Sequence, residues 1–165
     1  MAVDIAQIKT NIKSVLDTAN STLASYDLST GLSRRVRSVN KYNPEKLYPF
    51  TANNLPSVFV WTESKTVTPE TIAGTMSRGK RSAKVSFNIA GVFWNPYTST
   101  ITEDPADTDC EKLMENIEEV LRASDDLSST VKWNFPTDVT YHSAPNDEQS
   151  HLRIGILSLE ARVFY

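Results

Sequence analysis

Few residues of this sequence belong to types that carry catalysis or bind metals. The two histidines, His142 and His151, flank one polar stretch, and the single cysteine, Cys110, lies far from both along the chain. Zinc sites need three or four nitrogen, sulfur or carboxylate ligands, so no recognisable zinc set is present. Residue order alone leaves a serine–histidine–acid site open, but the Gly-x-Ser-x-Gly turn and the glycine-rich phosphate loop are both missing. We therefore expect no enzyme activity, no catalytic residue, no metal and no cofactor.

A run of carboxylates is the second candidate for chemistry. Asp104, Asp107, Asp109 and Glu111 are dense enough to attract a cation. They lack the central glycine and the ligand spacing of a calcium-binding loop. Acidic side chains are also favoured by the dipole at a helix N-terminus. We therefore interpret this run as the solvated start of a helix.

The helix in question is predicted over residues 104–124. Its apolar residues recur every three or four positions, as on one face of an amphipathic helix: Cys110, Leu113, Met114, Ile117, Val120 and Leu121. The opposite face carries four carboxylates: Asp107, Glu111, Glu115 and Glu118. Like charges at this spacing destabilise an isolated helix by about 0.2–0.5 kcal/mol per pair. A basic partner surface would remove that cost.

Charge is distributed unevenly along the 165 residues. The net charge is only −3. Residues 1–84 contain 12 Lys and Arg against 6 Asp and Glu, a net +6, whereas residues 85–165 contain 5 against 14, a net −9. The two halves can neutralise each other within one molecule, or they can form a head-to-tail interface between identical subunits.

Periodicity predicts the elements that must position these charges. We expect a first amphipathic helix over residues 4–24, with Leu23 on its apolar face, and an irregular connector over residues 26–56 that contains a weak edge strand at 33–41. Strands are expected over residues 57–61, 80–94, 138–143 and 152–165. The apolar phase of the last strand changes near Gly155, where we expect a bulge or a twist. The fold class is therefore α+β: one domain, residues 1–165, with an antiparallel four- to five-stranded sheet, two amphipathic helices on one face and the order α-β-β-α-β-β.

Two segments of this fold have open interpretations. Four cations lie within residues 34–41, where they could contact nucleic acid, dock an acidic neighbour or protect a sheet edge from mispairing. Residues 62–79 are rich in Thr and Ser and exceed the usual hairpin loop. We interpret them as a projecting loop that orders on a partner, with a mobile surface loop as the alternative.

The overall layout resembles the small tail-completion proteins of long-tailed phages, the tail terminators of the minor tail protein U group. The resemblance rests on an opening amphipathic helix, a proline-led strand (Leu55-Pro56-Ser57-Val58-Phe59-Val60), a long alternating strand (83–93), an acidic helix ending in a Leu-x-x-x-Asp-x-Leu-like turn (121–127) and a closing hairpin (139–165). It covers most of the chain and is one of layout, without an invariant motif.

This resemblance implies a structural virion protein that forms a ring, typically of six subunits. Such a ring caps the tail tube at its head-proximal end, stops tail elongation and then joins the head; DNA passes through the lumen without sequence-specific binding. Its partners are other copies of itself, the tail-tube protein and a head–tail connector.

Three groups of residues are then expected to form contacts. The acidic side of the subunit interface is Asp107, Glu111, Glu115 and Glu118; the basic side, or the lumen, is Arg34, Arg35, Arg37, Lys80 and Arg81. The loop that touches the tail tube contains Val67, Pro69, Ile72, Met76 and Arg78.

Other classes remain as alternatives. The chain could be a head-completion or neck connector protein, or a non-viral α+β binding module. No apolar run approaches the roughly 20 residues of a membrane helix, and we expect no signal peptide, so the protein is expected to be made in the host cytoplasm and to stay off membranes.

Overall fold

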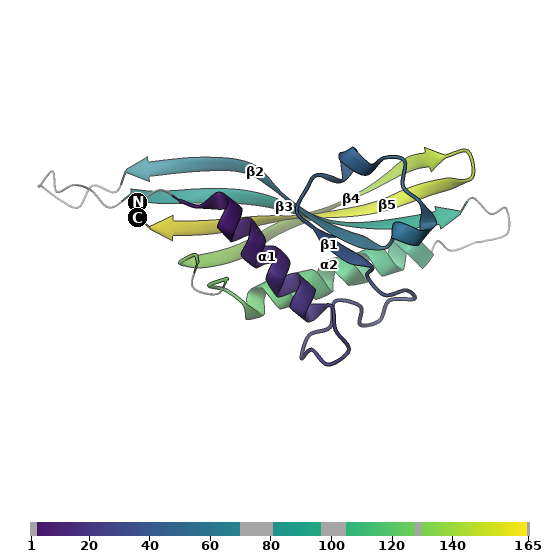
Figure 1. Ribbon diagram of the computed structural model, residues 1–165, viewed down its shortest axis with the longest axis horizontal. Coiled ribbons are helices and arrows are strands. Elements are labelled where there is room, and N and C mark those ends of the chain that lie inside the picture. The colour runs from purple at the N-terminus through teal and green to yellow at the C-terminus, as the bar shows by residue number, and fades with distance from the viewer. Residues whose placement is uncertain (1–2, 70–80, 97–104, 128–129, 165) are drawn as a thin grey trace, which may run out of the picture.

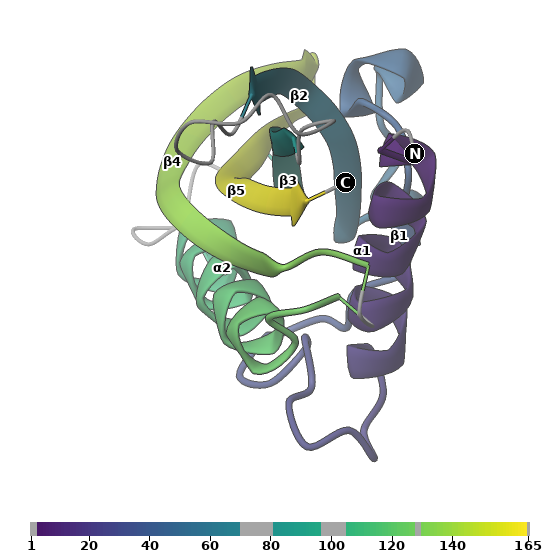
Figure 2. The same ribbon diagram turned by 90° about the vertical axis from the view of Figure 1, so that its left-hand side faces the viewer.

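A five-stranded sheet forms the centre of the protein, and both helices pack on one of its faces (Figures 1 and 2). The computed structural model describes residues 3–69, 81–96, 105–127 and 130–164. The helices are α1 (Ile5–Ala19) and α2 (Pro105–Ala123); the strands are β1 (Ser38–Asn40), β2 (Ser57–Pro69), β3 (Arg81–Pro96), β4 (Trp133–Asp147) and β5 (Ser150–Phe164). Two short 3-10 helices, Pro44–Leu47 and Ala52–Asn54, lie between β1 and β2.

The α+β class agrees with the prediction, but the sheet is mixed. Its strand order is β1-β2-β3-β5-β4, and every neighbouring pair is antiparallel except β1 with β2, which is parallel. The weak edge-strand signal at 33–41 corresponds to β1, so the element order is α-β-β-β-α-β-β rather than α-β-β-α-β-β. The segment between β1 and β2 returns the chain to the starting end of β1, because parallel neighbours require such a crossover.

Helix α1 begins as predicted and ends earlier. The Asp4 carboxylate accepts a 2.9 Å hydrogen bond from Gln7 N–H, which is an N-cap. At the other end, Asn20 N–H donates to Leu16 O at 3.0 Å, and the Asn20 side chain donates to Val36 O at 3.0 Å, so the chain turns away at this residue. The expectation that Leu23 continues the apolar face is wrong, because its side chain is 95% exposed.

Strand β2 extends through the first half of the predicted projecting loop. Residues 62–69 pair with β3 as far as Arg81, with one shift of register between Thr62 and Ser64. The prediction of a loop there is wrong because residues 63–68 are exposed on both faces, so they show none of the apolar alternation that identifies a half-buried strand. The remainder of the predicted loop, residues 70–79, lies outside the described residues.

The C-terminal hairpin is also longer than predicted. Strands β4 and β5 continue to Asp147 and Ser150, so the expected loop at 144–151 is reduced to a tight turn. Of the bulge or twist expected near Gly155, the bulge is absent, since β3 and β5 pair from Ser82 to Pro96 without a shift of register. The change of apolar phase has another cause: this end of the sheet is buried on both faces.

Two cores produce that double burial. The main core lies between the helices and the sheet and includes Ile12, Ile89, Ile117 and Leu157. The second core lies on the opposite face, where the segment between β1 and β2 covers the sheet; it consists of Phe50, Leu55, Phe59, Val92 and Leu152. The connector expected to be irregular is therefore a structural cover.

A buried asparagine fastens this cover to the β4–β5 hairpin. Asn146 Oδ1 accepts from Phe50 N–H at 2.8 Å, and its Nδ2 group donates to Phe50 O at 2.9 Å. Tyr48 Oη also donates to Pro145 O at 2.8 Å. The two Asn146 bonds satisfy the buried backbone groups of Phe50, which belongs to no strand.

Two glycines allow α2 to approach the sheet closely. Gly91 of β3 and Gly155 of β5 are register partners under the helix. A Cβ atom on Gly91 would lie 2.7 Å from Leu113 Cδ2, and one on Gly155 would lie 2.6 Å from Met114 Cγ. Larger residues at these positions would push the acidic helix away from the sheet.

Candidate subunit interface

The acidic face of α2 finds most of its counter-ions within the same chain. Asp107 forms an ion pair with Arg153 of β5. Glu115 Oε2 lies 2.9 Å from Lys112 Nζ, and Glu118 Oε1 lies 2.5 Å from Arg122 Nη2. The prediction that these carboxylates form one stack of unpaired like charges is wrong. Cations one turn away or on the neighbouring strand offset the repulsion at three of the four carboxylates.

Arg153 joins α2 to both strands of the C-terminal hairpin. Its side chain is 19% exposed, and besides pairing with Asp107 it donates to Ser143 Oγ at 3.0 Å. The guanidinium also lies 5.8 Å from the centre of the Tyr141 ring, within range of a cation–π contact. Burial raises the pKa of Tyr141, as do Cys110 and Glu111 nearby, while the positive charge of Arg153 acts in the opposite direction.

Two carboxylates of α2 are available to a binding partner. Glu111 and Glu119 are exposed, and neither forms an ion pair with another residue in the part of the chain that the structure describes. The negative charge of Glu111 raises the pKa of Tyr141 on β4, so this carboxylate lies near that edge strand. The acidic surface open to a partner is thus narrower than predicted and borders β4.

The predicted basic group does not form one patch. Arg35 forms a two-pronged pair with Asp27, with Nη1–Oδ2 at 2.9 Å and Nη2–Oδ1 at 3.2 Å. Burial would raise the pKa of Asp27, but the bonds from Arg35 and from Ser29 N–H outweigh it and lower the pKa. Arg35 is therefore already paired with a carboxylate of its own chain.

The other predicted cations lie at opposite ends of β2. Arg37 N–H donates to Pro56 O at 2.7 Å just before β2 starts, and Arg81 pairs with Pro69 where it ends. Arg34 lines a small hollow of about 90 Å³ beside the start of α2. All three side chains are exposed and form no ion pair among the described residues, whereas Lys80 lies outside them.

The predicted tail-tube loop is only partly described. Val67 lies in β2 and is 43% exposed, and Pro69 is the last residue of that strand. They are strand residues, so assigning them to a loop is wrong. Ile72, Met76 and Arg78 lie outside the described residues.

The carboxylate run at the start of α2 is not uniformly solvated. Asp109 is 8% exposed, and its Oδ1 accepts from Ser33 N–H at 3.2 Å. Two turns later the buried Asn116 side chain donates to Leu28 O and to Thr30 O, both at 2.9 Å. The interpretation of Asp109 as part of a solvated run is wrong, and Asn116 was not singled out from the sequence, although a polar residue interrupting the apolar side of a helix was the available signal. Both side chains fix the loop after α1 against α2.

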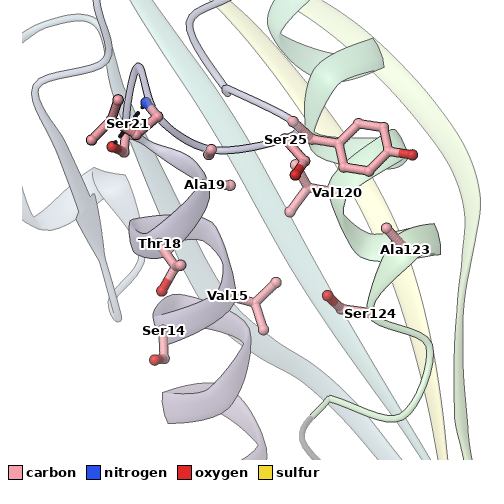
Figure 3. A pocket seen from close by; sticks show the side chains of 12 residues that line it. Ser14, Val15, Thr18, Ala19, Ser21, Ser25, Val120, Ala123 and Ser124 are labelled. Atoms are coloured by element: carbon pink, nitrogen blue, oxygen red, sulfur yellow. Dashed lines mark hydrogen bonds between the residues drawn. The ribbon is translucent and has the colours of Figure 1, made fainter.

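A groove runs between the C-terminal ends of the two helices. It has a volume of about 630 Å³ and is closed at one end by the loop after α1. Figure 3 shows Val15 and Thr18 of α1 and Val120 and Ala123 of α2 around this space. Its lining is uncharged and, apart from Leu23 and Tyr26, made of small or medium-sized side chains, which suits van der Waals contact better than recognition of a charged ligand.

Comparison with known proteins adds no assignment. The chain matches no model of a known protein family, and no curated protein sequence is significantly similar to it. Within the described residues, no helix has the length and apolar character needed to span a membrane. The same part of the chain contains no cluster of three or more His, Cys, Asp or Glu that could hold a metal ion.

Proposed function

We propose that this protein is a structural virion component that forms a ring on the head-proximal end of a phage tail tube. The ring, of six subunits by the resemblance drawn above, ends tail elongation and provides the surface to which the head joins. Its partners are further copies of itself, the tail-tube protein and a head–tail connector, and DNA passes through its lumen. The protein needs no cofactor and catalyses no reaction.

One observation carries the self-association in this proposal. Exposed charges of opposite sign lie on different elements: Glu111 and Glu119 on α2, and Arg34, Arg37 and Arg81 on the segments next to β2. None of the five forms an ion pair within the described part of the chain. A head-to-tail contact between copies brings such groups together, and heterologous contacts close into rings when the rotation between subunits closes.

The test is assembly of the purified protein. Light scattering gives the mass in solution, and negative-stain imaging, alone and with a tail-tube protein, shows whether rings cap tubes. The paired substitutions Glu111→Lys and Glu119→Lys should prevent ring formation while circular dichroism stays unchanged, because both side chains are exposed and neither forms an ion pair among the described residues. Glu148→Lys, an exposed residue of the β4–β5 turn, is the matched control and should assemble normally.

Two results would count against the proposal. A protein that stays monomeric and ignores tail tubes would overturn it, and unimpaired assembly of the Glu111→Lys, Glu119→Lys variant would remove its electrostatic part. Rings that bind a portal or neck assembly but never a tube would instead support the second candidate, a head-completion protein.

The groove between α1 and α2 favours a third candidate, a non-viral binding module. Leu23 and Tyr26 border the groove and are 95% and 52% exposed, so an apolar partner could contact them. Under this alternative, Leu23→Ser would abolish partner binding, whereas the tail-terminator proposal expects normal rings from that variant.

A further inference from the structure

We propose that copies of this chain join edge to edge, with β4 of one copy pairing with the free part of β2 of the next. This inference rests on the proposed ring and names the backbone segments that close it. The strand order places β4 at one edge of the sheet. At the other edge, β1 covers only Ser57, Val58 and Phe59, so the rest of β2 is an edge as well.

The free edge of β4 is protected at its ends and open in its middle. Pro136 and Pro145 each lie beside a shift of register in the β4–β5 ladder. Prolines and bulges are devices that prevent edge pairing. Residues 138–144, between them, contain neither Pro, Lys nor Arg, and their backbone receives no hydrogen bond from described residues outside the β4–β5 ladder. A strand of seven residues is therefore open to a partner.

The free edge of β2 has matching properties. Residues 63–68 are all exposed while in strand conformation, and five of these six residues are polar. Their backbone likewise receives no bond from described residues other than those of β3. An extended partner could add a strand here by main-chain hydrogen bonds, as in β-augmentation.

Strand directions are compatible with this contact. β2 is antiparallel to β3, β3 to β5 and β5 to β4, so β2 and β4 of one copy run in opposite directions. A second copy rotated about an axis along the strands keeps its directions, and its β2 then lies antiparallel to the first copy's β4. The sheet continues from copy to copy without a break in its pattern.

Charge selects this pairing over a two-fold contact between two β4 edges. α2 packs beside β4 and carries six carboxylates against two cations, and β4 adds Asp138 and Asp147 without a cation. Two such edges face to face would bring like charges together. α1 packs beside β1 and β2, and this side carries Lys9 together with Lys41, which donates to Thr10 Oγ1 at 3.0 Å, whereas Lys13 forms an ion pair with Asp17 of the same helix. Arg37 and Arg81 flank the two ends of β2.

Cysteine cross-linking tests the contact directly. Ser64, Thr66 and Thr68 of β2 and Asp138, Thr140 and His142 of β4 point to the sheet face opposite the helices and are exposed. Opposed residues on one face of an antiparallel pair lie about 4.5–5.5 Å apart, within the Cα range of a disulfide. The native Cys110 is buried and stays silent under mild oxidation. One set of single cysteine variants is made on β2, a second set with a different mass tag on β4, and the nine mixtures are oxidised.

We expect covalent dimers from at least one mixture and from no single variant alone. Lys84→Cys, on the same face of the interior strand β3, is the control and should cross-link with neither set. Dimers from Thr140→Cys alone would show β4–β4 contact and overturn the proposal. Rings without any β2–β4 cross-link would overturn it and leave the proposed function intact. Cross-linked assemblies that never cap tail tubes would support the edge contact and overturn the proposed function.

Discussion

Replacing Gly155 by alanine probes how tightly the acidic helix is seated. The new Cβ atom would lie 2.6 Å from Met114 Cγ, 2.8 Å from Met114 Sδ and 3.1 Å from Cys110 Sγ. Ordinary carbon contacts are about 3.5–4.0 Å long, so Met114 or the whole helix must move by about 1 Å. Met114 is only 1% exposed, so any movement of its side chain must displace neighbouring core atoms.

The magnitude follows from two opposing effects. Overpacking a filled core costs about 1–3 kcal/mol, while a glycine-to-alanine change at a compatible backbone conformation stabilises by about 0.4–1 kcal/mol through the unfolded chain. The backbone at Gly155 does not have a positive φ, so both effects apply. We expect a net loss of about 1–2 kcal/mol of unfolding free energy, and a melting temperature lowered by roughly 2–8 °C for a chain of this size.

Urea denaturation followed by circular dichroism measures this loss. The decisive comparison is the double variant Gly155→Ala with Met114→Ala, in which the new methyl group occupies space that Met114 has left. Its destabilisation should be smaller than the sum of the two single losses, by about 0.5–3 kcal/mol. Strict additivity, or a Gly155→Ala protein as stable as the wild type, would refute the close contact between α2 and β5.

Three further predictions follow from the same contacts. Arg153→Ala loses the pair with Asp107, the bond to Ser143 and the ring contact, so the unfolding free energy should fall by about 1–3 kcal/mol, and the pKa of Tyr141 should rise further in an absorbance titration. Asn146→Ala leaves both backbone groups of Phe50 unpaired and should cost about 2–3 kcal/mol in chemical denaturation, whereas Glu148→Ala in the same turn should cost almost nothing. Burial raises the pKa of Cys110 to about 12, so the stability that the protonated thiol contributes is complete below pH 9 and is lost as the pH rises towards 12. Cys110→Ala should therefore flatten the curve of unfolding free energy against pH in this range. A normal thiol titration in the folded protein would contradict this prediction.

Sequence patterns predicted the helices and strands that bury one face, and they failed for strand segments that are exposed on both faces. α2 was predicted within one residue at each end because its apolar stripe and flanking polar residues are regular. The second half of β2 and the two ends of β4, on either side of residues 138–143, were not predicted as strands, because residues such as Thr66 and Thr137 are exposed and give no alternation. Strands at a sheet edge with two polar faces carry a weak signal in any sequence.

The ion-pair partners of the candidate interface residues could not be predicted for a different reason. The identity of the acidic residues was visible in the sequence, but their partners depend on which strand lies beside the helix. Arg153 is far from Asp107 in sequence, and only the pairing of β5 with β3 places it next to α2. Arg35 was likewise assigned to an intermolecular contact, although Asp27, eight positions earlier, binds it. Counter-ions on other elements cannot be assigned before the topology is known.

These pairings change what must hold copies of the chain together. An exposed ion pair contributes about 0–1 kcal/mol, and among the exposed carboxylates of α2 only Glu111 and Glu119 lack a counter-ion within the described residues. Charge alone would therefore give a weak contact that salt screens. Main-chain hydrogen bonds between two open edges are not screened in this way, and net contributions of about 0.5–1.5 kcal/mol each add up over a strand of seven residues. Under the edge proposal, charge selects β2 over a second β4 as the partner, and the backbone supplies the larger share of the affinity.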